Sequence, residues 1–350
     1  MKRIKILLLF CLIIISLMVI SGCNQDKSVL NIYNWGQYID TDLLTKFEKE
    51  TGIKVVYELF ETNEHMLAKI ESGSSNFDLV FPSDYVIEEM ISKDMLHKID
   101  FNNIPNFQYI DNRFRNLEYD PTNEYSVPYF WGTLGILYNS EEVTQNVDSW
   151  SILWDEKYTG QILMLDSMRD TIGVALKLNG YSLNSVDPVQ LEEAKKMLIE
   201  QKALHNGYYV DETMDMMING DANIALNWSG AAMDIYWQGA EHIKYALPKE
   251  GSNLWVDCMV IPKTSENKKE AEMFINFMLD PDNAYQNTEY VGYATPNQIA
   301  FERMLEENPE VTDMDAYNPS QELLDKCEVF IDLGDNREMY NQLWTEIKVY

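Results

Sequence analysis

An alternation of short apolar strands with amphipathic helices constrains the fold of this chain more than any other feature. Near the start, Leu30 and Ile32 alternate with Asn31, which is the pattern of a strand with one buried face. Helix and strand patterns then follow in turn at residues 41–50, 53–57, 63–72 and 77–81. Such alternation predicts an α/β fold.

Aromatic side chains recur where the predicted strands end, which is where ligands bind in open α/β sheets. Two acids, Asp170 and Asp257, accompany these rings. Asp257 shares one face of an apolar strand with a tryptophan, because strand side chains repeat every two residues. Rings and acids together suit an organic cation with an apolar middle, although sugars also stack on rings, and rings can simply cover a sheet end. The rings are Trp35, Tyr38, Tyr85, Trp228, Trp255 and Tyr293.

The residues argue against an enzyme. The chain contains no zinc-protease helix motif, phosphate-binding loop, dinucleotide fingerprint or serine nucleophile elbow. Asp170 with Asp166 or with Asp257 would suit a glycosidase pair, but that chemistry needs a defined separation of the carboxylates. The four histidines have no metal-ligand spacing. We therefore expect no catalytic residue, no metal and no cofactor.

The first residues predict export. Lys2, Arg3 and Lys5 precede an apolar run at 6–20, which is the pattern of a signal peptide. The sequence ISGC at 20–23 resembles the lipobox of bacterial lipoproteins, and this resemblance implies that Cys23 is acylated. A plain signal peptide and an uncleaved anchor are the alternatives.

Charge and cysteine content limit the possible partners of the protein and the state of its thiols. The formal net charge is −30, which argues against a nucleic-acid partner. An acidic surface attracts cations, but it also serves solubility alone. After the leader and Cys23, only Cys258 and Cys327 remain, and we expect both to be free and buried, with a disulfide between them as the alternative.

Several short stretches together indicate a family. They are YNWGQY at 33–38, ETGIKV at 50–55, FDLV at 77–80, PSDY at 82–85, YSVPY at 125–129, WVD at 255–257 and GYATPN at 292–297. With these stretches, the chain resembles the spermidine/putrescine-binding proteins of polyamine ABC importers over nearly its whole length after the leader. The resemblance implies a two-lobed periplasmic-binding-protein fold of type II. The resemblance also implies a hinge between the lobes that lets them close over a ligand in the interlobe cleft.

The same resemblance assigns roles to individual residues. It implies an aromatic box formed by Trp35, Tyr38, Trp228, Trp255 and Tyr293. It implies polar contacts from Ser83 and Tyr85, and amine-binding carboxylates at Asp257 and Asp170.

Three positions depart from the family pattern. Gln37 stands where several members have an acid, Ser167 where an aspartate is common, and Phe330 near a usual glutamine. Fewer carboxylates favour a diamine such as putrescine, with its two ends at Asp257 and Asp170. Spermidine remains open, because another carboxylate is available from Asp84 or Asp166.

We expect a signal peptide at 1–22 and a tether at 23–28. Long crossing segments near 129–138 and 255–262 indicate two lobes, with lobe 1 at 29–135 and 257–305 and lobe 2 at 136–256 and 306–350. The expected protein is a monomer, held at the outer face of the membrane by its lipid. It would deliver a polyamine to permease subunits that work with a cytoplasmic ATPase. The alternative is a sensor subunit that signals to a membrane partner.

Overall fold

The computed structural model describes residues 28–73 and 76–349, so the predicted leader and Cys23 lie outside the described residues. The strands are β1 (Val29–Trp35), β2 (Lys54–Phe60), β3 (Leu79–Val80), β4 (Ser126–Asn139), β5 (Ile162–Leu165), β6 (His205–Tyr209), β7 (Ile224–Trp228), β8 (Ile243–Ala246) and β9 (Leu254–Val260). The α-helices are α2 (Thr41–Thr51), α3 (Asn63–Glu71), α4 (Asp84–Ser92), α5 (Met168–Leu178), α6 (Pro188–Gln201), α7 (Glu212–Asn219), α8 (Ser229–Trp237), α9 (Lys268–Met278), α10 (Pro281–Val291), α11 (Gln298–Glu307), α12 (Gln321–Leu324) and α13 (Arg337–Val349).

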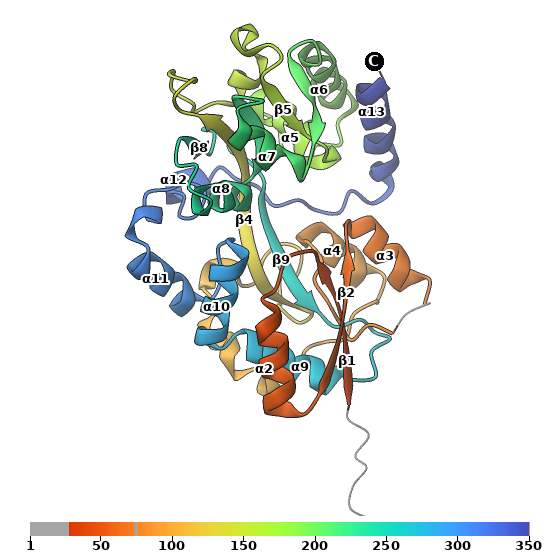
Figure 1. Ribbon diagram of the computed structural model, residues 1–350. Coiled ribbons are helices and arrows are strands. Elements are labelled where there is room, and N and C mark those ends of the chain that lie inside the picture. The colour runs from red at the N-terminus through yellow and green to blue at the C-terminus, as the bar shows by residue number, and fades with distance from the viewer. Residues whose placement is uncertain (1–27, 74–75, 350) are drawn as a thin grey trace, which may run out of the picture.

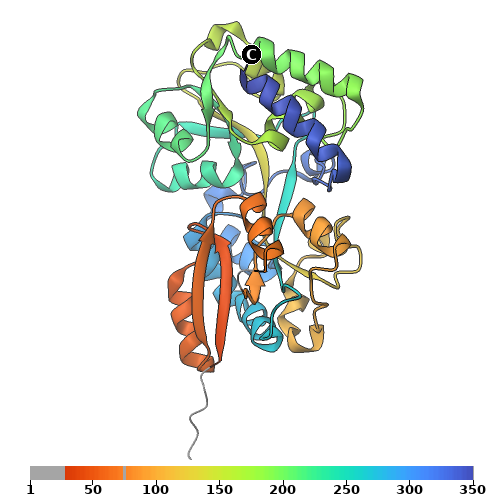
Figure 2. The same cartoon turned by 90° about the vertical axis from the view of Figure 1, so that its right-hand side faces the viewer.

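These elements form two lobes, one above the other in Figures 1 and 2. The lower one, lobe 1, contains β1 to β3, α2 to α4 and α9 to α11. The upper one, lobe 2, contains β5 to β8, α5 to α8 and α13. The predicted α/β class is confirmed, because strands and helices alternate in both lobes.

Strands β4 and β9 connect the lobes. They pair antiparallel with each other, and the strand order through both lobes is β2-β1-β3-β9-β4-β7-β5-β6, with β8 also on β4. Nearly every residue of β4 is buried, as its long apolar sequence requires. The prediction that the chain crosses between lobes near 129–138 and 255–262 is confirmed (Figure 1).

The described residues form two apolar cores. The larger core runs from lobe 1 through β9 to α8, and the second fills lobe 2 among β5, α5, α6 and α13. Cys258 lies in the larger core, where its thiol is 3.2 Å from the Tyr119 hydroxyl, whereas Cys327 is only partly buried. Both thiols are free, as expected.

A polar contact joins the lobes on the face formed by α4 and the start of α13. Glu89 of α4 forms an ion pair with Arg337 of α13, and the side chain of Glu89 is only 7% exposed. Beside it, Glu88 Oε2 accepts a hydrogen bond of 2.8 Å from the backbone N–H of Asp332. We call these four residues the interlobe latch.

Within the described ranges, none of the helices has the length and apolar character needed to cross a bilayer.

Candidate ligand-binding site

The first acidic group of the site is Asp257, on the face of β9 that it shares with Trp255. Its carboxylate is 7% exposed and accepts a hydrogen bond of 2.6 Å from the Tyr38 hydroxyl. Burial raises the pKa of Asp257 to about 6, although hydrogen bonds from Tyr38 and Ser83 oppose this shift. Among the residues that the structure describes, no lysine or arginine forms an ion pair with Asp257. The site therefore holds a buried carboxylate that still lacks a cationic partner.

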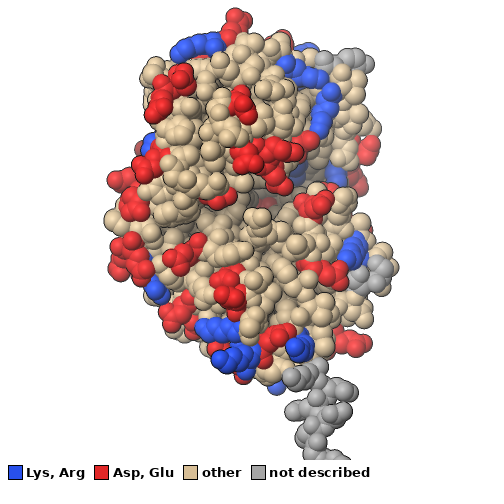
Figure 3. Space-filling view, in the orientation of Figure 1, with Lys and Arg blue, Asp and Glu red and all other residues tan. Residues whose placement is uncertain are grey.

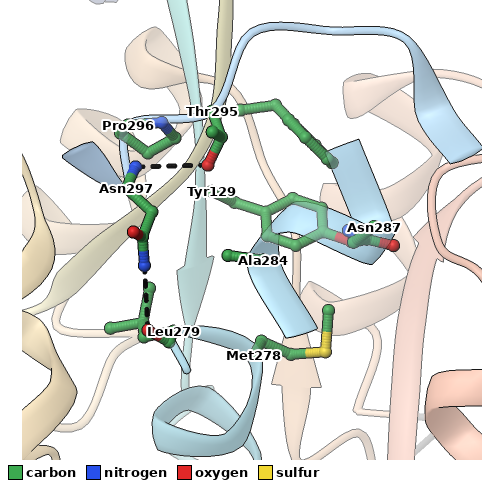
Figure 4. Close-up of a pocket in the computed structure, with 9 residues that line it drawn as sticks. Tyr129, Met278, Leu279, Ala284, Asn287, Thr295, Pro296 and Asn297 are labelled. Atoms are coloured by element: carbon green, nitrogen blue, oxygen red, sulfur yellow. Dashed lines mark hydrogen bonds between the residues drawn. The ribbon is translucent and has the colours of Figure 1, made fainter. Parts of the chain in front are cut away.

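Tyr38 is held in place from below. Its backbone carbonyl accepts a hydrogen bond of 2.7 Å from the Tyr129 hydroxyl, which in turn accepts one of 2.7 Å from Asn287 Nδ2. Figure 4 shows Tyr129 pointing toward Asn287 of α10. A cavity of about 10 Å³ lies beside these residues, which is enough for roughly one water molecule. This cavity lies beside the residues that hold Tyr38 and is too small for an organic ligand.

Aromatic rings surround Asp257. The Trp255 and Tyr293 rings meet edge to face with centroids 5.0 Å apart, and Tyr38 is 5.9 Å from Tyr293. Two glycines allow this packing, because a Cβ at Gly132 of β4 would clash with the Trp255 ring and one at Gly230 of α8 with the Tyr293 ring. Gly230 belongs to lobe 2 and Tyr293 to lobe 1, so the lobes touch at this ring.

Ser83 and Tyr85 reach the site from the start of α4. Asn63 of α3 donates hydrogen bonds to the Ser83 hydroxyl at 3.0 Å and to the Tyr85 hydroxyl at 3.1 Å. Ser83 occupies the N-cap position of α4, but its side chain makes no capping bond. Its hydroxyl instead lies between Asn63 and Asp257.

The second acidic group is Asp170, near the start of α5 in lobe 2. Its carboxylate is 5% exposed and accepts hydrogen bonds from Ser167 Oγ at 2.7 Å and Asn253 Nδ2 at 3.3 Å. Burial raises the pKa of Asp170, while hydrogen bonds from Ser167, Asn253 and Trp228 lower it. This places Trp228, at the end of β7, beside the second carboxylate.

Two predicted positions are not brought into this group. Gln37 is exposed in a tight turn, with a φ of 52°. Trp35 donates from Nε1 to the Phe81 carbonyl at 2.7 Å and packs against Phe60, with ring centroids 4.3 Å apart. Of the two further carboxylates considered, Asp84 is fully buried against backbone N–H groups, and Asp166 pairs with Lys348 at 2.7 Å.

The sequence matches the model of a known family over most of the chain. Residues 42–315 match the model of the bacterial extracellular solute-binding proteins. The chain belongs to this family.

Named relatives of this solute-binding protein agree with the match. It is 36% identical over 330 residues to the spermidine/putrescine-binding periplasmic protein of Escherichia coli K12, covering 93% of this chain and 92% of the relative. It is 35% identical over 326 residues to the Salmonella typhimurium protein of the same name, with the same coverage.

Solved structures confirm the two-lobed fold. A putative spermidine/putrescine ABC transporter protein from Listeria monocytogenes superposes with a TM-score of 0.86 at 44% identity, covering 93% of this chain and 100% of that one. The spermidine/putrescine ABC transporter substrate-binding protein PotD from Streptococcus pneumoniae gives 0.83 at 42% identity, covering 93% and 99%.

Sequence reasoning missed several residues that shape the site of this solute-binding protein. Asn253 bonds to Asp170, Asn63 bonds to Ser83, and Tyr129 supports Tyr38. Asn253 precedes Trp255 by two residues, so extending the alternation of β9 by one step would have placed it on the same face. The other two contacts join elements that the sequence pattern does not relate.

Arg169, next to Asp170 in the sequence, lies between the Tyr85 ring and the C-terminal segment. Its guanidinium lies 4.4 Å from the centre of the Phe330 ring and 5.9 Å from that of Tyr85. It donates to the Ile331 carbonyl at 3.2 Å and so fixes the segment that carries Phe330. Phe330 thus packs against Arg169 and Tyr85, where the family resemblance leads one to expect a glutamine.

Proposed function

We propose that this protein is the extracytoplasmic polyamine-binding component of an ABC importer, with putrescine as its preferred ligand and spermidine as the alternative. The observation that carries the proposal is the pair of buried carboxylates, Asp257 and Asp170, with aromatic rings around them. Spermidine/putrescine-binding relatives that align over more than nine-tenths of the chain support it.

The chemistry of the pair suits a diamine. Each carboxylate can accept N–H bonds from one primary ammonium, worth about 1.5–3 kcal/mol apiece. Trp255 and Tyr293 can cover the methylenes and attract an ammonium by about 0.5–2 kcal/mol per ring. A few such contacts are enough for micromolar affinity, near −8 kcal/mol, after the cost of ordering. Trp35 and Gln37 stand apart from this group of residues in the structure, and we propose for them a place only at the outer edge of the site.

Charge at the cleft supports a cationic ligand. Figure 3 shows a hollow across the middle of the molecule, with acidic side chains on its rims. With a net charge of −30, the protein would draw cations toward this opening.

We further propose that the ligand binds by lobe closure. Lobe 1 would comprise 29–135 and 257–305, lobe 2 would comprise 136–256 and 306–350, and β4 and β9 would carry the hinge. Cys23 would carry the lipid, palmitate included, and hold a monomer at the outer face of the membrane. There it would meet the permease subunits and, through them, the ATPase.

Calorimetric titration of the exported protein tests the proposal. Putrescine and spermidine are the ligands, and maltose and choline are the controls. Choline carries a positive charge but no N–H on its nitrogen, so it separates attraction by rings from hydrogen bonding to carboxylates. Micromolar or tighter binding of a polyamine, with no heat from either control, is the expected result. No heat from either polyamine would overturn the proposal.

A further inference from the structure

Asn253 carries a buried polar atom that the protein leaves without a partner. The residue is 3% exposed, immediately before β9. Its Nδ2 donates to Asp170 Oδ1 at 3.3 Å, whereas its Oδ1 has no hydrogen-bond partner. A buried acceptor of this kind is destabilising unless something donates to it.

The orientation of this amide is set by its neighbour. An ionised carboxylate only accepts hydrogen bonds, so Nδ2 must face Asp170, and Oδ1, on the other branch of the amide, is left for another donor. The backbone is fixed as well, because the Asn253 carbonyl accepts from Leu134 N–H at 3.1 Å and the next N–H donates to the Glu328 carbonyl at 2.9 Å. The side chain therefore cannot turn to satisfy Oδ1 without losing its bond to Asp170.

The position of Asn253 places it in the site. Asn253, Trp255 and Asp257 occupy every second position of one extended segment, so their side chains share one face. Asn253 is thus at the lobe 2 end of the row, Asp257 is at the lobe 1 end, and the Trp255 ring lies between them.

We propose that Asn253 determines specificity at the second amine position, where its Oδ1 accepts an N–H from the ammonium bound by Asp170. This inference rests on the proposed polyamine function. A primary ammonium has three N–H donors, so it can bond to Asp170 and to Asn253 together. A trimethylated end has none, and a single acetylated nitrogen has one donor and no charge. The pair therefore selects an unmodified primary amine at this end.

Two variants separate contact with the ligand from positioning of Asp170. Asn253→Leu has a similar shape and lacks both polar atoms. Asn253→Asp keeps the acceptor, but it replaces the donor to Asp170 with a second oxygen and so adds a carboxylate beside Asp170. Calorimetry with putrescine and spermidine should give an affinity at least about tenfold weaker for Asn253→Leu. Asn253→Asp should stay within about threefold of the parent or bind more tightly. If Asn253→Leu does not fold, the smaller Asn253→Ala replaces it with the same expected loss.

The possible results distinguish failure of this inference from failure of the polyamine function. Equal loss in both variants would mean that Asn253 only orients Asp170, which overturns the inference. An affinity within about twofold of the parent for Asn253→Leu would overturn it too, while the polyamine function stands. A parent protein that binds neither polyamine would remove the function and this inference together. Thermal unfolding of the ligand-free variants serves as the folding control.

Discussion

Arg337 and Glu89 form an ion pair across the two lobes, and Glu89 lies on α4, the helix that is preceded by Ser83 and carries Tyr85 in its first turn. Because the partners belong to α13 of lobe 2 and α4 of lobe 1, we expect the pair to break when the lobes open. Its free energy therefore adds to the closed state and not to either lobe alone.

Glu89→Gln should weaken polyamine binding by about threefold to tenfold, since a partly buried ion pair contributes about 1 kcal/mol to closure. Calorimetry gives the affinity, and small-angle X-ray scattering with ligand gives the degree of closure. Lys98→Gln is the matched control, because its pair with Glu124 lies within lobe 1. The same loss in both variants would contradict a role of the latch in closure.

Asp257→Ala should reduce polyamine affinity by about 2–5 kcal/mol, because it leaves a buried ammonium without its carboxylate. Calorimetry or competition binding measures the loss. Asp94→Ala is the control, since the Asp94 side chain is 82% exposed and pairs with Lys263 on the surface. A loss below tenfold for Asp257→Ala would show that another group holds the amine.

The raised pKa of Asp257 predicts opposite effects of pH on binding and on stability. Polyamine affinity should fall as the pH drops through about 6, because the carboxyl becomes protonated. Stability of the ligand-free protein should move the other way, because the folded state keeps a proton that the unfolded chain has lost between about pH 4 and 6.

Asp257→Asn tests this stability difference directly. It should raise the free energy of unfolding by about 2–3 kcal/mol at about pH 8 and leave it unchanged near pH 4. Denaturant unfolding at the two pH values measures both. An equal effect at both values would mean that the carboxylate is not responsible.

Gly230→Ala should block closure, because the added Cβ meets the Tyr293 ring of the other lobe. Affinity for polyamines should fall at least about tenfold, and scattering should show a more extended particle with ligand. Gly173→Ala is the control, since its Cβ meets only the movable end of Leu183 within lobe 2. Thermal unfolding of both variants checks that the lobes stay intact. Normal closure of Gly230→Ala would contradict the close approach.

Much of the fold could be predicted from the sequence, because the periodicity of apolar residues shows which faces of a strand or helix are buried. The crossing strands β4 and β9 were predicted from their long apolar runs, and the shared face of Trp255 and Asp257 followed from a repeat of two. The local pattern is sufficient to predict burial in these cases, because the spacing of apolar residues within a segment shows which of its faces is buried.

The rest of the site depends on contacts between distant segments. Asn63 meets Ser83 and Tyr129 supports Tyr38 only after α3, β4 and the loop following β1 have packed. The latch likewise joins residues 248 positions apart. Trp35 packs on Phe60 instead of on the other rings because β1 and β2 pair in register at those two residues. No short pattern in the sequence carries this information.

The place of β9 between β3 and β4 also dictates when the protein can fold. Lobe 1 begins at β1, yet its sheet joins β4 only through a strand that ends at Val260. A chain that emerges from its N-terminus onward must therefore leave that sheet open until about three-quarters of its length has appeared. Such late, long-range pairing slows folding. The same topology that lets two lobes share one sheet thus makes the joining of their two groups of strands a late event in folding.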